Sequence, residues 1–373
     1  MIDKKVVAFV LAGGKGTRLG SLTKKNAKPA VWYGGKYRII DFVLSNVAIS
    51  NISSVAIATQ YESVELVNYT SNGQFWGFNG INSEFSILSP RQKEEGQSWY
   101  DGTADAVFKN LDFLDSRKPD YVLILSADHI YRMDYQKLIA FHEENKADCT
   151  ICTIEVPLED RSRFGMVNFD EKRRLIEFEE KPRQTKLKEA SMGVYVFNYK
   201  VLRDELIKDS KDEKSSHDFG KNIIPHLLNA KKKVYCYLFN GYWRDVGTIE
   251  SLWKANLDLI NTKEAQELFG ENENTRVMSQ DNRSLPQYIG PNARVTSSLI
   301  NQGSVIFGRV DNSVIFSNVV IEEGAIIQDS VLMPNCHIGK NARIYKALVA
   351  SDVTIEEDRE VNKEQEKVVL INS

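Results

Sequence analysis

The sequence predicts an α/β protein in which a doubly wound domain with a mixed sheet is followed by a parallel β-solenoid. Over residues 1–260, short apolar strands alternate with helical patterns. From residue 288 onward, large apolar residues recur about every six positions. The segment 261–285 between them is polar and lacks a long apolar period. We therefore expect a first domain over 1–260, a linker over 261–285 and a solenoid over 286–373.

The strands of the first domain are expected at short apolar runs. The early runs, such as VVAFVLA and YVLILS, are apolar on both faces, as in strands buried between two helical layers. The expected strands are Val6–Ala12, Val55–Thr59, Tyr121–Ser126, Cys149–Val156, Ser191–Phe197 and Val234–Phe239. The helices expected between them are Ile39–Ser50, Thr103–Asp115, Asp134–Glu144, Asp218–Asn229 and Thr248–Ile260. In a doubly wound sheet, ligands bind beyond the carboxyl ends of the strands. Functional residues are therefore expected in the loops that follow strands.

The solenoid is predicted from six-residue repeats in which a small residue follows a large apolar one by four positions. The clearest repeats are 332–337 (LMPNCH) and 338–343 (IGKNAR). This period fits neither an amphipathic helix nor a simple hairpin, but it suits one short strand per hexad. Three hexads per coil give about 18 residues, and hence about four coils over 289–356. An ordinary β-sandwich with Gly and Asn turns is the alternative.

Composition excludes several classes of protein. The chain has 373 residues, a net charge of −3, 42% apolar residues and 10% aromatic residues, which excludes global disorder. The near-neutral charge argues against a protein that coats nucleic acid or anionic membrane. Four cysteines make no disulfide framework, and no apolar run approaches the ~20 residues of a membrane span. We expect a cytoplasmic protein that binds neither nucleic acid nor membrane.

A glycine-rich loop follows the first strand in the segment 10–18, VLAGGKGTR. Glycines let backbone N–H groups approach phosphate oxygens, and Lys15 and Arg18 add positive charge. The loop lacks the Gly-Lys-Ser/Thr of a Walker motif, and Leu19 stands where the dinucleotide fingerprint needs its last glycine. A plain strand-to-helix turn is the alternative. The basic residues, with Lys28 further on, favour a nucleotide.

The segment from Leu11 to Asn46 resembles the bacterial glucose-1-phosphate adenylyltransferases, which belong to the sugar-nucleotidyltransferase superfamily. The resemblance extends over nearly the whole chain and is carried by further blocks in the same order. They are SWYDGTADAV at 98–107, ADHIYRMDY at 127–135, EFEEKP at 177–182, ASMGVYVF at 190–197, SSHDFGKNIIP at 215–225 and GYWRDVGT at 241–248. That family carries a left-handed parallel β-helix after its nucleotidyltransferase domain, which agrees with the hexads.

The reaction implied by the resemblance is ATP plus α-D-glucose 1-phosphate giving ADP-glucose and diphosphate, which supplies ADP-glucose for glycogen synthesis. The sugar phosphate is already anionic at neutral pH, so no general base is needed. The resemblance implies that Asp128 and Asp245 bind Mg²⁺, the expected cofactor. A helix cap is the alternative for a lone Asp after a strand. Arg18 and Lys28 are the implied cations at the triphosphate, and Arg18, Lys28 and Asp128 the implied catalytic residues.

The remaining implied site residues divide between the two substrates. For the sugar phosphate they are Tyr100, Glu180, Lys181, Ser191 and Gly193. For the nucleotide they are Leu11, Ala12, Gly13, Gly14, Gln60, Gly102 and Thr103. The alternative for Lys181 is a solvated charge run, and the alternative for Trp99 and Tyr100 is aromatic packing. His217 and Asp218 could also reach the sugar site, with helix capping as the alternative for Asp218.

The sequence also departs from the family. Ala127 stands where a glycine usually precedes the metal-binding aspartate, and Trp32-Tyr33 replaces a common Pro-Phe. The resemblance implies an allosteric enzyme that is a homotetramer, or a hetero-oligomer with a paralogous subunit. A non-catalytic regulatory subunit and a transferase using another nucleoside triphosphate are the rival functions. Cys149 and Cys152 are three residues apart on a predicted strand, so their side chains point to opposite faces. We therefore expect core cysteines rather than a metal site.

Overall fold

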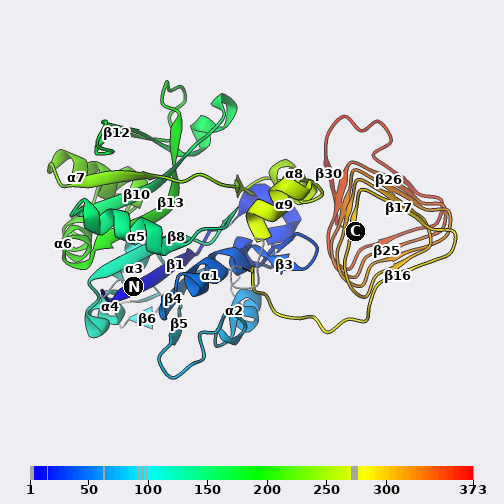
Figure 1. Ribbon diagram of the computed structural model, residues 1–373, viewed down its shortest axis with the longest axis horizontal. Coiled ribbons are helices and arrows are strands. Elements are labelled where there is room, and N and C mark those ends of the chain that lie inside the picture. The colour runs from blue at the N-terminus through cyan, green and yellow to red at the C-terminus, as the bar shows by residue number, and fades with distance from the viewer. Residues whose placement is uncertain are drawn as a thin grey trace.

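The computed structural model describes residues 4–14, 16–61, 64–90, 92–93, 96–97, 99–269 and 276–372. Figure 1 shows two parts side by side, an α/β domain built on a twisted sheet and a triangular β-helix. Within the described residues, no helix combines the length and apolarity needed to cross a bilayer.

A nine-stranded sheet forms the frame of the first domain. Its main path is β12-β11-β13-β8-β1-β4-β5, and β10 pairs with β13 and β14. The run β8-β1-β4-β5 is parallel, whereas β13 is antiparallel to both β8 and β10, so the sheet is mixed as predicted. The strands are β1 (Val6–Ala12), β4 (Ser54–Thr59), β5 (Glu84–Leu88), β8 (Tyr121–Ser126), β10 (Cys149–Glu155), β11 (Gly165–Phe169), β12 (Leu175–Glu180), β13 (Glu189–Asn198) and β14 (Val234–Leu238).

Helices cover both faces of this sheet, as the doubly apolar strands predict. The helices described in the chain are α1 (Ile39–Ile49), α2 (Val64–Thr70), α3 (Thr103–Phe108), α4 (Leu111–Arg117), α5 (Tyr135–Glu144), α6 (Tyr199–Asp209), α7 (Ile224–Asn229), α8 (Ile249–Asp258) and α9 (Thr262–Phe269). One core contains residues of α1, α2 and α5, and the other contains residues of α3, α4, α6 and α7.

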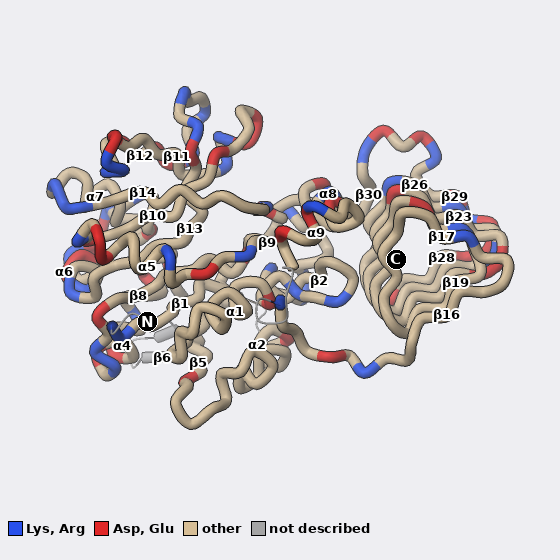
Figure 2. The backbone as a smooth tube through the Cα atoms, in the orientation of Figure 1, with Lys and Arg blue, Asp and Glu red and all other residues tan. Residues whose placement is uncertain are grey.

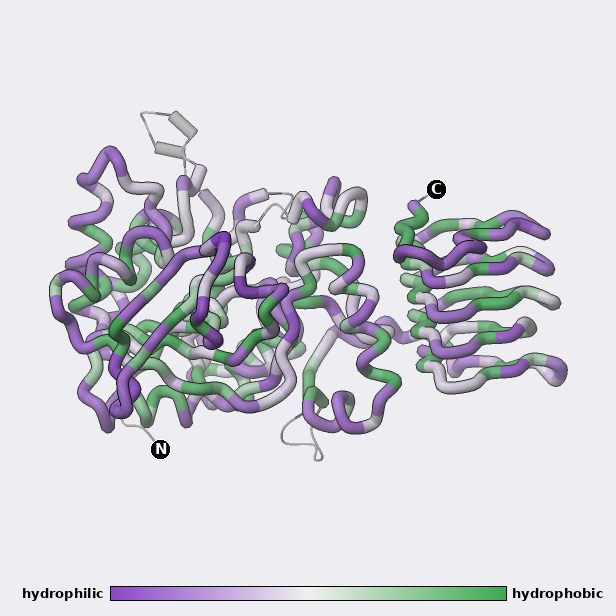
Figure 3. The backbone as a smooth tube through the Cα atoms, turned by 90° about the horizontal axis from the view of Figure 1, so that it is seen from above, coloured by the Kyte–Doolittle hydropathy of each residue, from purple (hydrophilic) through white to green (hydrophobic). Residues whose placement is uncertain are grey.

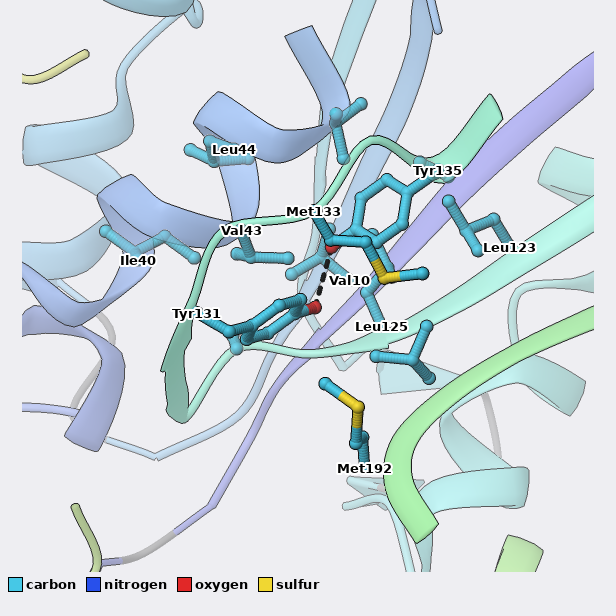
Figure 4. Close-up of a cluster of buried hydrophobic side chains, with 14 of the residues drawn as sticks. Val10, Ile40, Val43, Leu44, Leu123, Leu125, Tyr131, Met133, Tyr135 and Met192 are labelled. Carbon is cyan, nitrogen blue, oxygen red and sulfur yellow. Dashed lines mark hydrogen bonds between the residues drawn. The ribbon is translucent and has the colours of Figure 1, made fainter. Parts of the chain in front are cut away.

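Alternate residues of β1 enter the two cores: Val10 lies in the first, and Phe9 in the second. Figure 4 shows the first core, where the hydroxyls of Tyr131 and Tyr135 are hydrogen-bonded at 2.6 Å among apolar side chains. Cys152 lies in the first core and Cys149 in the second. The two cysteines therefore face opposite sides of the sheet, as expected.

Two of the expected helices are interrupted. The helix expected over Thr103–Asp115 is split into α3 and α4, because Asn110 turns its side-chain amide onto the Ala106 carbonyl and the Tyr100 hydroxyl. The helix expected over Asp218–Asn229 begins with a π-helical turn, Phe219–Ile223, before α7. Helices α2 and α6 were not expected, because their charged and polar residues obscure the apolar period.

The β-helix consists of three parallel sheets of five strands each. The first is β16 (Tyr288–Ile289), β19 (Val305–Ile306), β22 (Val320–Ile321), β25 (His337–Ile338) and β28 (Thr354–Ile355). The second is β17 (Arg294–Thr296), β20 (Arg309–Asp311), β23 (Ile326–Gln328), β26 (Arg343–Tyr345) and β29 (Glu360–Val361). The third is β18 (Leu299–Ile300), β21 (Val314–Ile315), β24 (Val331–Leu332), β27 (Ala347–Val349) and β30 (Val369–Ile371). This stack, seen edge-on in Figure 3, is consistent with the left-handed parallel β-helix expected.

Five strands per sheet correspond to five coils in the described residues, so the expected four coils of about 18 residues are corrected. Stacked turn residues are 17 positions apart in the central coils. In the central coils, the step from the second sheet to the third is one residue shorter than a hexad, as between the starts of β23 and β24. The extra coil was missed because the repeat weakens after residue 356, where charged residues replace apolar ones.

The two domains share one apolar cluster. Phe316 of the β-helix is fully buried and meets Trp32 edge-to-face, with ring centroids 6.4 Å apart. The indole N–H of Trp253 on α8 donates to the Asp329 carbonyl at 2.7 Å. In Figure 2, the charged residues of the β-helix gather mainly away from this face. Trp32, noted as a departure from the family pattern, therefore packs at the contact between the domains.

The segment expected as a linker contains helix α9, which the polar composition of 261–285 concealed. Leu268 is buried, and the ring of Phe269 stacks on Tyr37 at 5.2 Å. Further on, the Met278 backbone exchanges two hydrogen bonds with the Ser45 hydroxyl. Both stretches of this segment are thus fastened to the first domain; residues 270–275 lie outside the described residues.

Side chains of stacked turn residues in the β-helix are joined by hydrogen bonds from coil to coil. We predict that these turns depend on residues that tolerate a left-handed backbone. Asn335 has φ of 63° and donates from its side chain to Asp352 at 2.9 Å. Asn335→Ala and Asn335→Gly both lose this bond, but only alanine adds the steric cost of positive φ. The alanine variant should be less stable than the glycine variant by about 1 kcal/mol, which would appear as a lower melting temperature. An alanine variant as stable as the glycine variant would contradict this.

Candidate active site

Three neighbouring parallel strands end at one edge of the sheet. The glycine-rich loop follows β1, Gln60 follows β4 and Asp128 lies two residues after β8. Because parallel strands present their carboxyl ends together, these residues meet at one place. Gly13 lies so close to Gln60 that an added Cβ would stand 3.3 Å from the Gln60 Cβ.

A small antiparallel ribbon brings the second carboxylate to this edge. Strand β9 (His129–Tyr131) begins directly after Asp128 and pairs with β15 (Trp243–Asp245). The register places Asp245 opposite His129, and therefore beside Asp128. Two aspartates far apart in the sequence thus become neighbours through three residue pairs.

Lys28 lies between the two carboxylates. Its Nζ is 3.0 Å from Oδ2 of Asp128 and 3.2 Å from Oδ1 of Asp245. The other oxygen of Asp245 pairs with the Arg163 guanidinium. The other oxygen of Asp128 accepts from the Ser126 hydroxyl and lies 3.2 Å from Nε2 of His129. All four carboxylate oxygens therefore have a partner in the protein.

These contacts fix the charge states of the cluster. Burial acts to raise the pKa of Asp128, but His129 and Lys28 outweigh it and hold that pKa well below its usual range. Burial likewise opposes ionisation of Asp245, yet Lys28 leads the groups that lower the pKa of this carboxyl. Burial acts to lower the pKa of Lys28, and the two aspartates together raise it above its ordinary value. Lys28, Asp128 and Asp245 are therefore all ionised at neutral pH.

The same cluster has donors that fit a divalent cation. Asp128, His129 and Asp245 each offer a ligand atom, and these atoms lie within 4.8 Å of one another. Two carboxylates with room for phosphate oxygens form the kind of donor set that suits Mg²⁺. The aspartates fit this cation by their chemistry, although Lys28 now stands between them.

Two cavities meet at Asp128. The first, of about 410 Å³, is lined by the glycine loop and the carboxyl ends of β1 and β4. Of the residues expected at the nucleotide, it contains Leu11, Gly13, Gly14, Gln60, Gly102 and Thr103. Ala12 instead has its side chain in the core, so only its backbone faces this edge. Lys28 also lines the first cavity, whereas Lys15 lies outside the described residues.

The second cavity, of about 290 Å³, lies on the other side of Asp128. Of the residues expected at the sugar phosphate and the reacting groups, it contains Arg18, Glu180, Lys181, Ser191, Gly193 and Asp245. The Lys181 ammonium is 3.2 Å from Glu180 and largely exposed, so it remains accessible to an anion. A Cβ on Gly220 would stand 2.4 Å from the Glu180 carboxylate, so the glycine makes room for that side chain.

Some expected residues are placed differently. Tyr100, expected at the sugar phosphate, lines the first cavity, and its hydroxyl donates to the Leu88 carbonyl. His217 contacts Asp209 at 2.8 Å. Asp218 caps the π-helical turn by accepting from Gly220 and Lys221, which was the alternative considered for it, and it also lines both cavities. The methyl group of Ala127 packs in the core.

Sequence reasoning missed three members of the carboxylate cluster. Arg163 is hidden in the charged run 159–163, where nothing distinguishes it from a solvated residue. Ser126 is the last residue of β8, and its position in the sequence suggests only the end of a strand. His129 follows Asp128 directly, and this adjacency was a signal that could have found it. In the structure, its Nε2 lies 3.2 Å from Oδ1 of Asp128, and its ring centroid is 5.1 Å from that of Trp243.

Comparison with known proteins agrees with this geometry. The nucleotidyl transferase family matches residues 7–262, and the GlmU-like C-terminal hexapeptide family matches residues 285–368. Proteins named glucose-1-phosphate adenylyltransferase from Bacillus mycoides (strain KBAB4) and Bacillus thuringiensis (strain Al Hakam) are each 48% identical over 99% of this chain and 98% of their own length. The protein of that name from Bacillus anthracis is 47% identical over the same share. The chain therefore belongs to the nucleotidyl transferase family, within its group of bacterial glucose-1-phosphate adenylyltransferases.

Proposed function

We propose that the chain transfers the adenylyl group of ATP to glucose 1-phosphate, giving ADP-glucose and diphosphate. The observation that carries this proposal is the meeting of two cavities at one carboxylate, Asp128. One cavity has the glycine loop and the amide of Gln60, which suit a nucleotide. The other has Lys181 and Glu180, which suit the phosphate and hydroxyls of a sugar phosphate.

The reaction needs charge compensation more than acid–base chemistry. A phosphate oxygen of the sugar phosphate attacks the α-phosphorus of ATP, a new P–O bond forms, and the bond to the diphosphate leaving group breaks. Both reactants are anions, so their approach is the main obstacle. Arg18 lines the second cavity and Lys28 the first. Both are proposed to neutralise the negative charge of the phosphates while the new P–O bond forms and the bond to diphosphate breaks.

We propose Asp128 and Asp245 as the residues that hold Mg²⁺. When bound, the cation supplies charge neutralisation at the triphosphate. The chain's own contribution is to keep both carboxylates ionised and adjacent, which the β9–β15 pairing and the cationic neighbours achieve. Lys181 is proposed to bind the sugar phosphate, and Glu180 and Ser191 to accept or donate hydrogen bonds to its hydroxyls.

We further propose that the chain assembles into a homotetramer. The first coil of the β-helix supports self-association, because apolar side chains there remain exposed where no further coil covers them. They are Tyr288, Ile289, Val295 and Leu299. Light scattering of the purified chain measures the mass of the assembly; a monomer would contradict this part of the proposal.

The activity is tested by diphosphate release with the purified chain, Mg²⁺ and glucose 1-phosphate, comparing ATP, UTP, dTTP and GTP. We predict turnover by this chain alone, with ATP giving the highest kcat/KM. Turnover that is absent without a second, paralogous subunit would favour the regulatory-subunit alternative. A preference for another nucleotide would refute adenylyl transfer.

Asp128→Asn should lower kcat/KM by about 100-fold or more, because a neutral amide removes charge from the reacting centre. The amide keeps the size of the side chain, so far-ultraviolet circular dichroism should be unchanged. Asp204→Asn, on the exposed side of α6, is the matched control and should keep full activity. Near-normal turnover by the Asp128→Asn variant would remove Asp128 from the mechanism.

Lys181→Ala should mainly raise the KM for glucose 1-phosphate, by about tenfold or more, because a charged contact to the ground state and the transition state is lost together. The KM for ATP should change little. Arg183→Ala removes an exposed cation two residues away and serves as the control. Equal KM values for the sugar phosphate in the Lys181 variant and the unaltered protein would refute this role.

A further inference from the structure

Lys28 has an unusual position for a residue proposed to contact a triphosphate. Its side chain is 6% exposed, and its ammonium lies between Asp128 and Asp245 rather than toward open space. It begins the short 3-10 turn Lys28–Ala30 and is followed by Pro29, so its backbone is held in place. The ammonium therefore lies between the two carboxylates that are proposed to hold the metal ion.

Both carboxylates have a cationic partner within the protein. Lys28 contacts Asp128 and Asp245, and Arg163 contacts Asp245 and also Asp160. The two cations differ in position, because Arg163 contacts the oxygen of Asp245 that Lys28 does not contact. Of these two cations, only Lys28 contacts both aspartates, so Lys28 is the cation with which a metal ion held by both would compete.

We infer that Lys28 is a built-in counter-ion that holds the metal position in the protein without substrates, and that it moves to the triphosphate when the metal arrives. This inference rests on the proposed metal role of Asp128 and Asp245. Lys28 also lines the glycine-loop cavity beside Gly13 and Gly14, so its new partners lie within the space that its side chain already borders.

The consequence is a coupling between the metal and the nucleotide. A metal ion that binds alone displaces a buried ammonium and leaves it without a partner, which is costly. A metal ion that arrives with a triphosphate brings the anionic oxygens that the displaced ammonium needs. The chain therefore binds a bare divalent cation weakly, and Lys28 discriminates against it.

The test is titration of the substrate-free full chain with Mn²⁺ alone, followed by the electron paramagnetic resonance signal of the free ion. Lys28→Met removes the competing charge while keeping the length of the side chain, so Mn²⁺ should bind at least about tenfold more tightly than to the unaltered protein. Lys181 is a cation in the second cavity that pairs with Glu180 and not with either aspartate. Lys181→Met is therefore the matched control and should leave Mn²⁺ affinity unchanged.

Thermal unfolding provides a second measurement that keeps the test decisive if Lys28→Met folds poorly. Lys28→Gln keeps hydrogen-bond donors but carries no charge. This variant should melt at a lower temperature than the unaltered protein without metal, and Mn²⁺ should raise its melting temperature more than it raises that of the unaltered protein. An equal response to Mn²⁺ in both proteins would overturn the inference.

Asp128→Asn separates failure of the inference from failure of the proposed function. If Asp128→Asn abolishes Mn²⁺ binding but Lys28→Met binds no more tightly than the unaltered protein, Lys28 is not a counter-ion in the metal position, while the metal role of Asp128 stands. If the double variant Lys28→Met/Asp128→Asn binds Mn²⁺ as tightly as Lys28→Met does, the proposed metal role fails, and this inference fails with it.

Discussion

Two carboxylates that face each other across one ammonium are the constraint on which the rest of this structure depends. Asp128 and Asp245 repel each other and are costly to bury, so each needs a cation or a hydrogen-bond donor on every oxygen. The protein supplies these through Lys28, Arg163 and Ser126. A site prepared in this way offers a fixed cluster of charge at which two phosphorylated molecules can react.

The fold explains why this cluster can form at all. Asp128 follows a strand whose two faces are both buried, so its backbone is fixed by two cores. Asp245 is brought beside it by a short antiparallel pairing outside the main sheet. The β-helix lies away from both cavities but shares an apolar cluster with the residues around Trp32. The packing of the second domain is thereby continuous with the turn that carries Lys28.

Much of this arrangement could be predicted from the sequence. Strands such as β1 and β8 are continuous apolar runs, and their bounds follow directly from the pattern. The glycine loop, Asp128 and Lys181 each lie in a local sequence motif, so they could be identified as candidate site residues. Helix α9 could not be predicted in the same way, since few of its residues are apolar and its stability depends on a tertiary contact of Phe269 with Tyr37. The role of Arg163 could not be predicted either, because it depends on an ion pair with Asp245, which is distant in the sequence.

The pairing of Lys28 with both aspartates is the least visible feature in the sequence and the most consequential one. The most direct measurement is a crystal structure with Mn²⁺ and a non-hydrolysable ATP analogue, in which anomalous scattering locates the metal. We predict an anomalous peak between Asp128 and Asp245, with the Lys28 ammonium turned to the phosphates. A peak elsewhere, or Lys28 still between the two aspartates beside bound nucleotide, would contradict it.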